Sequence, residues 1–324
     1  MPSGNQVILP TSSKGLRKVT IQKPDTLLSE NIKKDVVIGG VTGDLEAPPT
    51  GPYIEYTSLD SSGRVFTAKF RGTIVPEYAF AYLAELTSVD MPDNVIAIGD
   101  NGFYRCPKLS LTSLPSGITS LGDYVFRDCP RLALTSLPSG ITSIGQYAFR
   151  NCSKMVLTSL PSGITSIGDF AFLNCYQLSL TTLPSGITSI GQYAFNNCPR
   201  LALTALPSGI TSLPTAAFQY CPKLALTTFP SGMTSIGAYA FKQGTGLASI
   251  TLPPALTAIG NQAFANCYNL KVCDCTECTA VPTLGASVFQ NAHADFKILV
   301  PSALEEEWKA AANWSSYASQ IIGV

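Results

Sequence analysis

The sequence has little charge, a single histidine and no long apolar run, and each shortage excludes a class of protein. Charged residues make up 13% of the 324 residues, and the formal net charge is zero because Lys plus Arg equals Asp plus Glu. This balance gives no overall attraction to nucleic acid or to an anionic membrane. No stretch approaches the ~18 consecutive apolar residues of a membrane-spanning helix, so no membrane insertion is expected.

The start of the chain also lacks a secretion signal. Residues 1–6 read MPSGNQ and contain neither the basic region nor the apolar core of a signal peptide. We expect either a mature form from which a leader has been removed, or a protein that is made in a cytoplasm and reaches its destination without secretion. Virion proteins take the second route.

A repeat of 23 residues dominates what is present. Phenylalanine recurs at this spacing from Phe80 to Phe264, and cysteine follows the same period with one gap at Gly244. Eight clean copies run from Leu86 to Asn269. One coil of this length cannot bury its own apolar face, but stacked coils share a continuous core. The sequence therefore predicts a repeat solenoid that is mainly β with short helical turns.

Each copy divides into short segments, as the copy at residues 132–154 illustrates. Its first apolar residues are expected on a short strand, which Pro138 ends because proline cannot donate to a ladder. Ile141 and Ile144 form a second apolar segment, and a single helical or 3-10 turn is expected to follow. The strand contains Leu132, Leu134 and Leu137, and the turn contains Ala148, Phe149 and Cys152.

These residues resemble the BspA-like leucine-rich repeat, a repeat of bacterial cell-surface and phage proteins with the pattern LxxIxIPxxVTxIGxxAFxxC. Residues 86–106 and 247–267 fit this pattern directly. The copies between them place their apolar strand residues at positions 1, 3 and 6 instead of 1, 4 and 6, as in Leu109, Leu111 and Leu114. This departure indicates a bulge or a shifted strand face.

The C-terminal segment is expected to cover the last coil. Residues 296–321 resemble the terminal VPxxxxxxYKxAxNWSxYAxxI segment of BspA-like arrays. Ser302 and Glu305 have the spacing of a capping box, and residues 303–313 are rich in Ala and Glu, so a helix is predicted there. We expect this segment to lay three aromatic side chains over the last coil, namely Trp308, Trp314 and Tyr317.

Residues 1–46 carry no repeat. Their segment 15–46 resembles a small α+β module of tail, fibre and baseplate proteins from phages and prophages of Gram-positive gut bacteria, with the form KVTV...LxxENIKKGVTIxGVTGTLE. Residues 30–34 (ENIKK) and 40–43 (GVTG) match this form. Asp35 and Asp44 depart from it, since glycine and threonine are usual there. The resemblance implies attachment to a tail or baseplate.

The predicted organisation follows from these segments. An N-terminal attachment module at 1–46 precedes a Pro-rich linker at 47–52, the leucine-rich repeat solenoid at 53–295 and a helical C-terminal cap at 296–324. No heptad and no collagen repeat specifies a stoichiometry, so a homo-oligomer stays open.

The cysteine column is the obvious candidate for chemistry. Thiols stacked at one coil position suggest disulfides, a metal site or a ladder of buried free cysteines. We favour the ladder because buried cysteine packs as a small hydrophobe. Cys273, Cys275 and Cys278 form CxCxxC, but a zinc site needs four ligands and His293 is the only histidine. His293 also lacks the partners of a catalytic site, so neither a cofactor nor an enzyme activity is expected.

Two surfaces are candidate binding sites. The first, the hydroxyl face, is the outward side of the predicted strands and offers a nearly uncharged platform for a glycan or an extended protein segment, although Ser and Thr also simply solvate a β face. The second, the basic rim, suits an anionic polymer such as teichoic acid or is merely a solvated edge. The hydroxyl face is formed by Ser110, Thr112, Ser113, Thr135, Ser136, Thr158, Ser159, Thr181, Thr182, Thr204 and Thr227. The basic rim is formed by Lys108, Arg131, Lys154, Arg200 and Lys223, with Arg105, Arg127 and Arg150 nearby in the sequence.

Two further columns repeat with the coils. The tyrosines either stack sugars or cover the edge of the core, and we favour the second interpretation. The asparagines are expected to form a ladder of side-chain hydrogen bonds between neighbouring turns. The columns are Tyr124, Tyr147, Tyr193 and Tyr239, and Asn151, Asn174, Asn197 and Asn266.

Three functions follow from these observations. The first hypothesis is a phage or prophage tail protein in the virion, which attaches to the tail or baseplate through residues 1–46 and recognises a host cell-surface protein or glycan through the solenoid. The alternative is a secreted BspA-like adhesin of the bacterial cell surface that binds host protein or glycan. The third, a repeat-bearing enzyme, has no catalytic constellation to support it. No nucleic-acid partner is expected.

Overall fold

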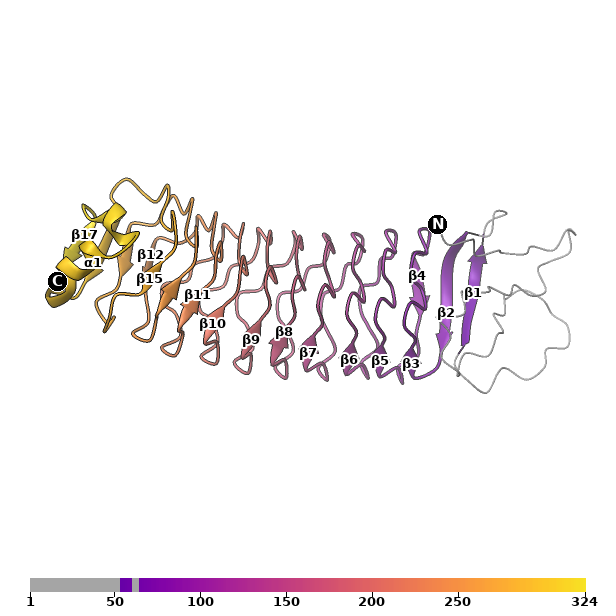
Figure 1. Cartoon of the computed structure of the whole chain (residues 1–324). Helices are drawn as coiled ribbons and strands as arrows, with labels where there is room; N and C mark the ends of the chain where they lie inside the picture. The colour runs from indigo at the N-terminus through magenta and orange to yellow at the C-terminus, as the bar shows by residue number, and fades with distance from the viewer. Residues whose placement is uncertain (1–52, 60–63) are drawn as a thin grey trace, which may run out of the picture.

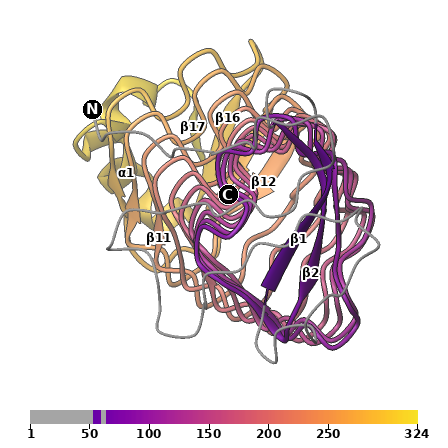
Figure 2. The same cartoon turned by 90° about the vertical axis from the view of Figure 1, so that its right-hand side faces the viewer.

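The computed structural model describes residues 53–59 and 64–324, which form an elongated solenoid of stacked coils (Figure 1). Seen along the solenoid axis, successive coils follow one another closely, so equivalent residues line up in columns (Figure 2). The repeat solenoid predicted from the 23-residue period is therefore confirmed. The predicted module at 1–46 and the linker at 47–52 lie outside the described residues.

One side of each coil carries a two-residue strand whose second residue is buried. Neighbouring strands pair in parallel and in register, so Ile144 lies beside Ile167 and Ile167 beside Ile190. They form three sheets in the orders β3-β5-β6, β7-β8-β9 and β10-β11-β13-β15. The strands are β3 (Ile74–Val75), β5 (Ala97–Ile98), β6 (Ser120–Leu121), β7 (Ser143–Ile144), β8 (Ser166–Ile167), β9 (Ser189–Ile190), β10 (Ser212–Leu213), β11 (Ser235–Ile236), β13 (Ala258–Ile259) and β15 (Thr283–Leu284).

The sequence explains why one sheet ends at β9 and the next begins at β10. In the preceding coil the N–H of Gly191 donates to the carbonyl of Ile167 at 2.8 Å. Pro214 occupies the equivalent position in the next coil and has no N–H to donate. The ladder therefore loses a hydrogen bond at this coil, and it resumes where Gly237 donates to Leu213 at 2.8 Å.

A second group of strands lies at the two ends of the solenoid. At the N-terminal end β1 (Tyr53–Leu59) pairs antiparallel with β2 (Val65–Arg71), and β2 pairs in parallel with β4 (Ser88–Asp90). This hairpin covers the first coil. At the C-terminal end the parallel order is β12-β14-β16-β17, from β12 (Ser249–Thr251), β14 (Val272–Asp274), β16 (Lys297–Val300) and β17 (Ile321–Gly323).

The middle coils lack the strand that we predicted from Leu132, Leu134 and Leu137, so that prediction is wrong. A half-buried strand must alternate between inward and outward residues. Leu132 and Leu134 alternate, but Thr135 and Ser136 are both exposed before the chain turns inward again. The 1-3-6 spacing thus breaks the period of two, and residues 132–138 form an irregular segment with no strand.

The predicted helical turn around Phe149 is also absent. The N–H groups of Tyr147, Phe149 and Asn151 donate to carbonyls of the next coil at 2.8 Å, so they are not available for helical hydrogen bonds. Tyr147 and Asn151 adopt the left-handed conformation, with φ of 55° and 62°. The same two positions are left-handed in coil after coil. Each corner is therefore a turn that is bonded to its neighbour rather than a helix.

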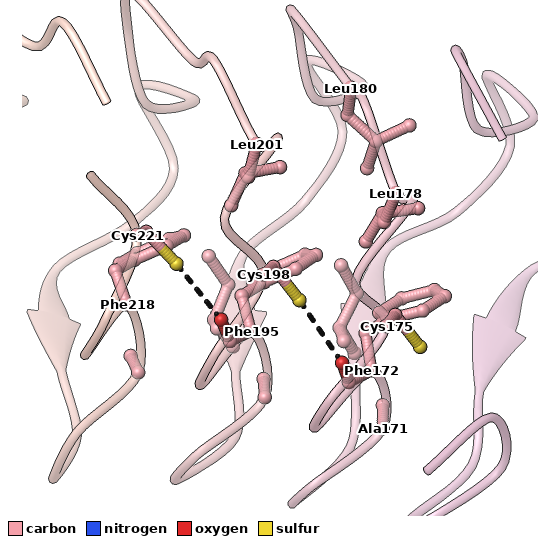
Figure 3. Close-up of a cluster of buried hydrophobic side chains, with 14 of the residues drawn as sticks. Ala171, Phe172, Cys175, Leu178, Leu180, Phe195, Cys198, Leu201, Phe218 and Cys221 are labelled. Carbon is pink, nitrogen blue, oxygen red and sulfur yellow. Dashed lines mark hydrogen bonds between the residues drawn. The ribbon is translucent and has the colours of Figure 1, made fainter. Parts of the chain in front are cut away.

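Stacked phenylalanines form the centre of the core. From Phe80 to Phe289 the rings of neighbouring coils have centroids 4.9–5.8 Å apart and planes within 12° of parallel. Each column cysteine donates its thiol to the phenylalanine carbonyl of the preceding coil, as Cys198 does to Phe172 at 3.1 Å (Figure 3). All of these cysteines are buried and free, which confirms the predicted ladder.

The C-terminal segment covers the last coil, but with less helix than predicted. The helical elements are η1 (Ser302–Leu304), α1 (Glu305–Ala310) and η2 (Trp314–Tyr317), so α1 is shorter than residues 303–313. The predicted capping box is wrong, because Leu304 is the N-cap and no side chain caps the helix. Glu305 instead pairs with Lys309 at 2.7 Å. Among the described residues, no helix has the length and hydropathy to cross a membrane.

The three aromatic residues of this segment do cover the core. Trp308 and Trp314 are fully buried with ring centroids 4.5 Å apart. The indole N–H of Trp314 donates to the carbonyl of Pro282 at 2.7 Å. Tyr317 meets the ring of Phe289 edge-on, with centroids 5.5 Å apart.

Candidate functional site

The hydroxyl face lies on the irregular segments of the middle coils rather than on strands. Every residue assigned to it is exposed, and the stacked coils bring the members of each column side by side. The segments between them make few hydrogen bonds to neighbouring coils, such as the 3.3 Å bond from Thr135 N–H to the carbonyl of Thr112. A role of this face in binding stays a prediction.

A second hydroxyl column, which the sequence reasoning missed, lies on the strand side of the coils. In several coils the threonine that precedes the strand donates its hydroxyl to a carbonyl of the preceding coil, as Thr165 does to Thr142 at 3.3 Å and Thr257 does to Thr234 at 2.9 Å. These hydroxyls are therefore already bonded within the solenoid. Their 23-residue spacing is visible in the sequence, but it does not distinguish a structural column from a binding column.

A shallow groove of about 400 Å³ runs across β7, β8 and β9. Its lining includes the hydroxyls of Ser143, Ser166 and Ser189 and the polar side chains of Gln146 and Asp169. The carboxylate of Asp169 accepts two hydrogen bonds from Gln192, one from its backbone N–H at 2.9 Å and one from its side chain at 3.0 Å. This arrangement orients polar groups, and it offers hydrogen bonds to a hydroxyl-rich ligand.

The basic rim is only partly free to bind an anion. Lys108 forms an ion pair with Glu85 of the preceding coil. Arg131, Lys154, Arg200 and Lys223 are exposed, and no described carboxylate lies within 4.0 Å of them. Lys108 is therefore neutralised locally, whereas the other four rim residues keep an unpaired charge.

The asparagine column forms the predicted ladder of side-chain hydrogen bonds, and most of the tyrosine column forms a stack of rings that the sequence reasoning did not predict. Asn174 donates its side-chain amide to Asn151 at 2.7 Å, and Asn197 donates to Asn174 at 2.9 Å. The rings of Tyr124, Tyr147, Phe170 and Tyr193 stack with centroids 4.6–4.8 Å apart and planes within 11° of parallel. The faces that these rings turn towards their neighbours are covered by the neighbouring rings, so a sugar cannot stack on them.

Arginines cover part of this ring column, a contact that the sequence reasoning missed. The guanidinium carbon of Arg127 lies 5.3 Å from the ring centroids of both Tyr104 and Tyr147. That of Arg150 lies 5.7 Å from Tyr147. Both separations fall within the range of a cation–π interaction. A tyrosine followed three residues later by an arginine does not by itself predict a contact. In this protein the left-handed turn at Tyr147 brings its side chain and that of Arg150 together.

The column thiols are buried in surroundings that disfavour the reactive thiolate. Burial raises the pKa of the Cys106, Cys221 and Cys267 thiols to about 12, so they stay protonated and weakly nucleophilic at neutral pH. The Sγ atoms of Cys273 and Cys275 lie 3.7 Å apart in the core. Across residues 53–59 and 64–324, no three His, Cys, Asp or Glu side chains are placed to hold a metal ion.

The sequence matches a family model described as BspA type Leucine rich repeat region, over residues 73–202 and 166–295. No curated protein matches it. Among solved structures it is similar to a leucine rich cell surface protein from Faecalibacterium prausnitzii, with 22% identity, 87% of this chain and 95% of that chain covered, and a TM-score of 0.44. A leucine-rich repeat protein from Bacteroides ovatus shares 19% identity over 99% of both chains with a TM-score of 0.46. The T. pallidum leucine rich repeat protein shares 24% identity over 66% of this chain and 86% of that chain, with a TM-score of 0.44.

Proposed function

Because this chain belongs to the BspA-type leucine-rich repeat family, we propose that it is a non-enzymatic recognition protein that acts at a bacterial cell surface or after secretion. In this proposal the solenoid binds a protein or glycan of another cell, as an adhesin does. The virion location that we took as the first hypothesis from residues 1–46 becomes the second candidate.

The observation that carries the proposal is the continuous exposed polar surface of the solenoid. The same exposed positions recur through the middle coils, and the stacked backbone holds them in columns. Repeat solenoids use such extended surfaces for binding. The thiols of the cysteine column are buried in the core and are not part of this surface.

Binding of the fluorescently labelled full chain to intact epithelial and bacterial cells tests this function. We expect saturable binding to one cell type that excess unlabelled chain displaces. Binding that does not saturate, or that the unlabelled chain leaves unchanged, contradicts the proposal.

Two sets of variants then assign the surface. Thr135→Glu/Thr158→Glu/Thr181→Glu places charge on the hydroxyl face, and Arg131→Glu/Lys154→Glu reverses charge on the basic rim. All five side chains are exposed, so neither set removes core packing. A loss of binding in the first set alone assigns the hydroxyl face, and a loss in the second alone assigns the rim.

The second candidate is a tail or baseplate protein of a phage or prophage. The resemblance of residues 15–46 to a tail and baseplate module supports it. This candidate predicts that mass spectrometry of purified particles from the producing strain finds the chain in stoichiometric amounts. Peptides released by trypsin from intact producing cells would instead favour the adhesin.

A further inference from the structure

Three arginines and four tyrosines cluster on one edge of the N-terminal coils. Arg105 lies over Tyr104 and Tyr82, with the guanidinium carbon 5.2 Å and 6.0 Å from the ring centroids. Arg127 and Arg150 lie in the next two coils, at the coil position that Tyr104 occupies in the first. We name this set the arginine–tyrosine cluster, and it comprises Tyr82, Tyr104, Arg105, Tyr124, Arg127, Tyr147 and Arg150.

Contacts with the rings fix the guanidinium groups of this cluster. Arg127 lies among three rings, since Tyr124 is 5.5 Å away in addition to Tyr104 and Tyr147 at 5.3 Å. Its side chain is 23% exposed, so the group is partly desolvated but still reaches the surface. A guanidinium group packed among rings in this way keeps a planar fork of donors, and less side-chain entropy is lost when an anion binds it.

The donors of the cluster have few partners within the protein. The Nε atoms of Arg127 and Arg150 are covered and have no hydrogen-bond acceptor. Within the described part of the chain, no carboxylate lies within 4.0 Å of Arg150 and no acceptor receives its terminal N–H groups. The ring of Tyr147 is therefore its main contact, and its Nη donors are free for a ligand.

The nearby carboxylates are already engaged. The Oδ2 atom of Asp128 forms ion pairs with the Nε atoms of Arg105 at 3.7 Å and Arg127 at 3.4 Å, without a hydrogen bond to Arg127 Nε. Its other carboxylate oxygen accepts a hydrogen bond from Asn151. Asp123 accepts two hydrogen bonds from Gln146, at 2.9 Å and 2.8 Å. One carboxylate thus contacts two of the three arginines, and the cluster keeps a net positive charge. The exposed, unpaired Arg131 and Lys154 of the basic rim add to it in the same coils.

We propose that the arginine–tyrosine cluster binds an acidic glycan, a sugar chain that carries carboxylate or sulfate groups. Guanidinium forks match the paired oxygens of these anions. This proposal rests on the proposed function and names the ligand class for one of its surfaces.

The ring geometry favours a glycan over a nucleic acid. Single-stranded nucleic acids bind when bases stack on open aromatic faces. Here Tyr124 and Tyr147 stack on each other with centroids 4.7 Å apart, and Phe170 stacks on the other face of Tyr147 at 4.6 Å, so Tyr147 has no open face. The hydroxyl groups of the two tyrosines have no protein partner among the described residues, so they are available as hydrogen-bonding groups for sugar hydroxyls.

The chain offers a matched control for this proposal. Lys242 occupies the same coil position as Arg127 and Arg150 and lies 5.3 Å from the ring centroid of Tyr239. Its ammonium group already donates to the side chain of Gln262 at 2.8 Å. Lys242→Gln therefore removes the same kind of charge from the same column outside the cluster.

The experiment measures binding of the full chain to heparin and to polygalacturonate oligosaccharides, with neutral dextran and poly(U) as comparisons. We expect one or both acidic glycans to bind, and added salt to weaken the binding. Arg127→Gln/Arg150→Gln should raise Kd about tenfold or more, and Lys242→Gln should change it less than about twofold. Heparin carries sulfate as well as carboxylate groups, so a preference for heparin shows that sulfate adds to recognition, and equal or stronger binding of polygalacturonate shows that carboxylate suffices.

A second, more conservative variant separates loss of binding from loss of folding. Arg127→Lys/Arg150→Lys keeps both charges but loses the planar forks, and it should raise Kd about threefold. Unchanged binding of this variant contradicts recognition by planar guanidinium groups. The proposal is also overturned if neither glycan binds, if only poly(U) binds, or if Lys242→Gln weakens binding as much as the double glutamine variant. If the glycans fail while competed cell binding persists, this inference fails and the proposed function stands.

Discussion

Phe195 offers a direct test of how the stacked core holds the solenoid together. Its ring is fully buried between Phe172 and Phe218, with centroids 5.3 Å and 5.4 Å away and planes within 10° of parallel. Truncation to alanine removes the ring from both neighbours and leaves a cavity. Phe195→Ala should therefore lower the free energy of unfolding by about 3–5 kcal/mol.

A second substitution separates stacking from burial. Phe195→Leu keeps much of the apolar volume but loses two ring–ring contacts, each worth about 0.5–1.5 kcal/mol. It should lower the free energy of unfolding by about 1–3 kcal/mol. Urea denaturation followed by circular dichroism measures both changes, and the exposed Thr181→Ala is the control, with an expected change below about 0.5 kcal/mol. A loss below about 1 kcal/mol for Phe195→Ala would refute the role of the stack.

Two further predictions concern the cysteines and the C-terminal cap. The thiols of Cys106, Cys221 and Cys267 have a pKa of about 12 in the fold against an ordinary value of 9.0, so above pH 9 the unfolded chain releases protons that the folded chain retains. These thiols should therefore not affect the free energy of unfolding below pH 9, and they should lower it as the pH rises from 9 towards 12. Urea denaturation at several pH values in this range measures the change. A free energy of unfolding that stays constant would contradict the prediction. Trp314→Phe removes the indole N–H that donates to the carbonyl of Pro282 at 2.7 Å. It should lower the free energy of unfolding by about 1–3 kcal/mol. An unchanged midpoint of urea denaturation would show that this hydrogen bond contributes nothing to stability.

The core could be predicted from the sequence because its residues repeat. Phenylalanine and cysteine at a period of 23 residues must fall in columns once the coils stack, and Figure 3 shows them so. The strands were harder to place. Leucines at positions 1, 3 and 6 predict a strand, but the paired outward residues Thr135 and Ser136 prevent it. The strand forms instead at Ser143–Ile144, where one outward residue precedes one inward residue.

The candidate site depends on contacts that the sequence does not specify. The exposure of the hydroxyl face follows from the repeat, since its residues lie between buried leucines. The contact between Arg150 and Tyr147 depends on the left-handed backbone at Tyr147, with φ of 55°, and a non-glycine residue rarely adopts it. The neutralisation of Lys108 by Glu85 likewise depends on the stacking of neighbouring coils.

Hydrogen exchange of the full chain, with and without a saturating surface extract from cells that bind it, tests the central claim that the solenoid is the recognition element. The irregular segments of the middle coils, such as residues 132–138, make few hydrogen bonds to their neighbours, so their amides should exchange quickly in the free protein. The account predicts that exchange slows in peptides from the middle coils when the extract is added. Slowing confined to peptides from residues 1–52, with the coils unchanged, would contradict it.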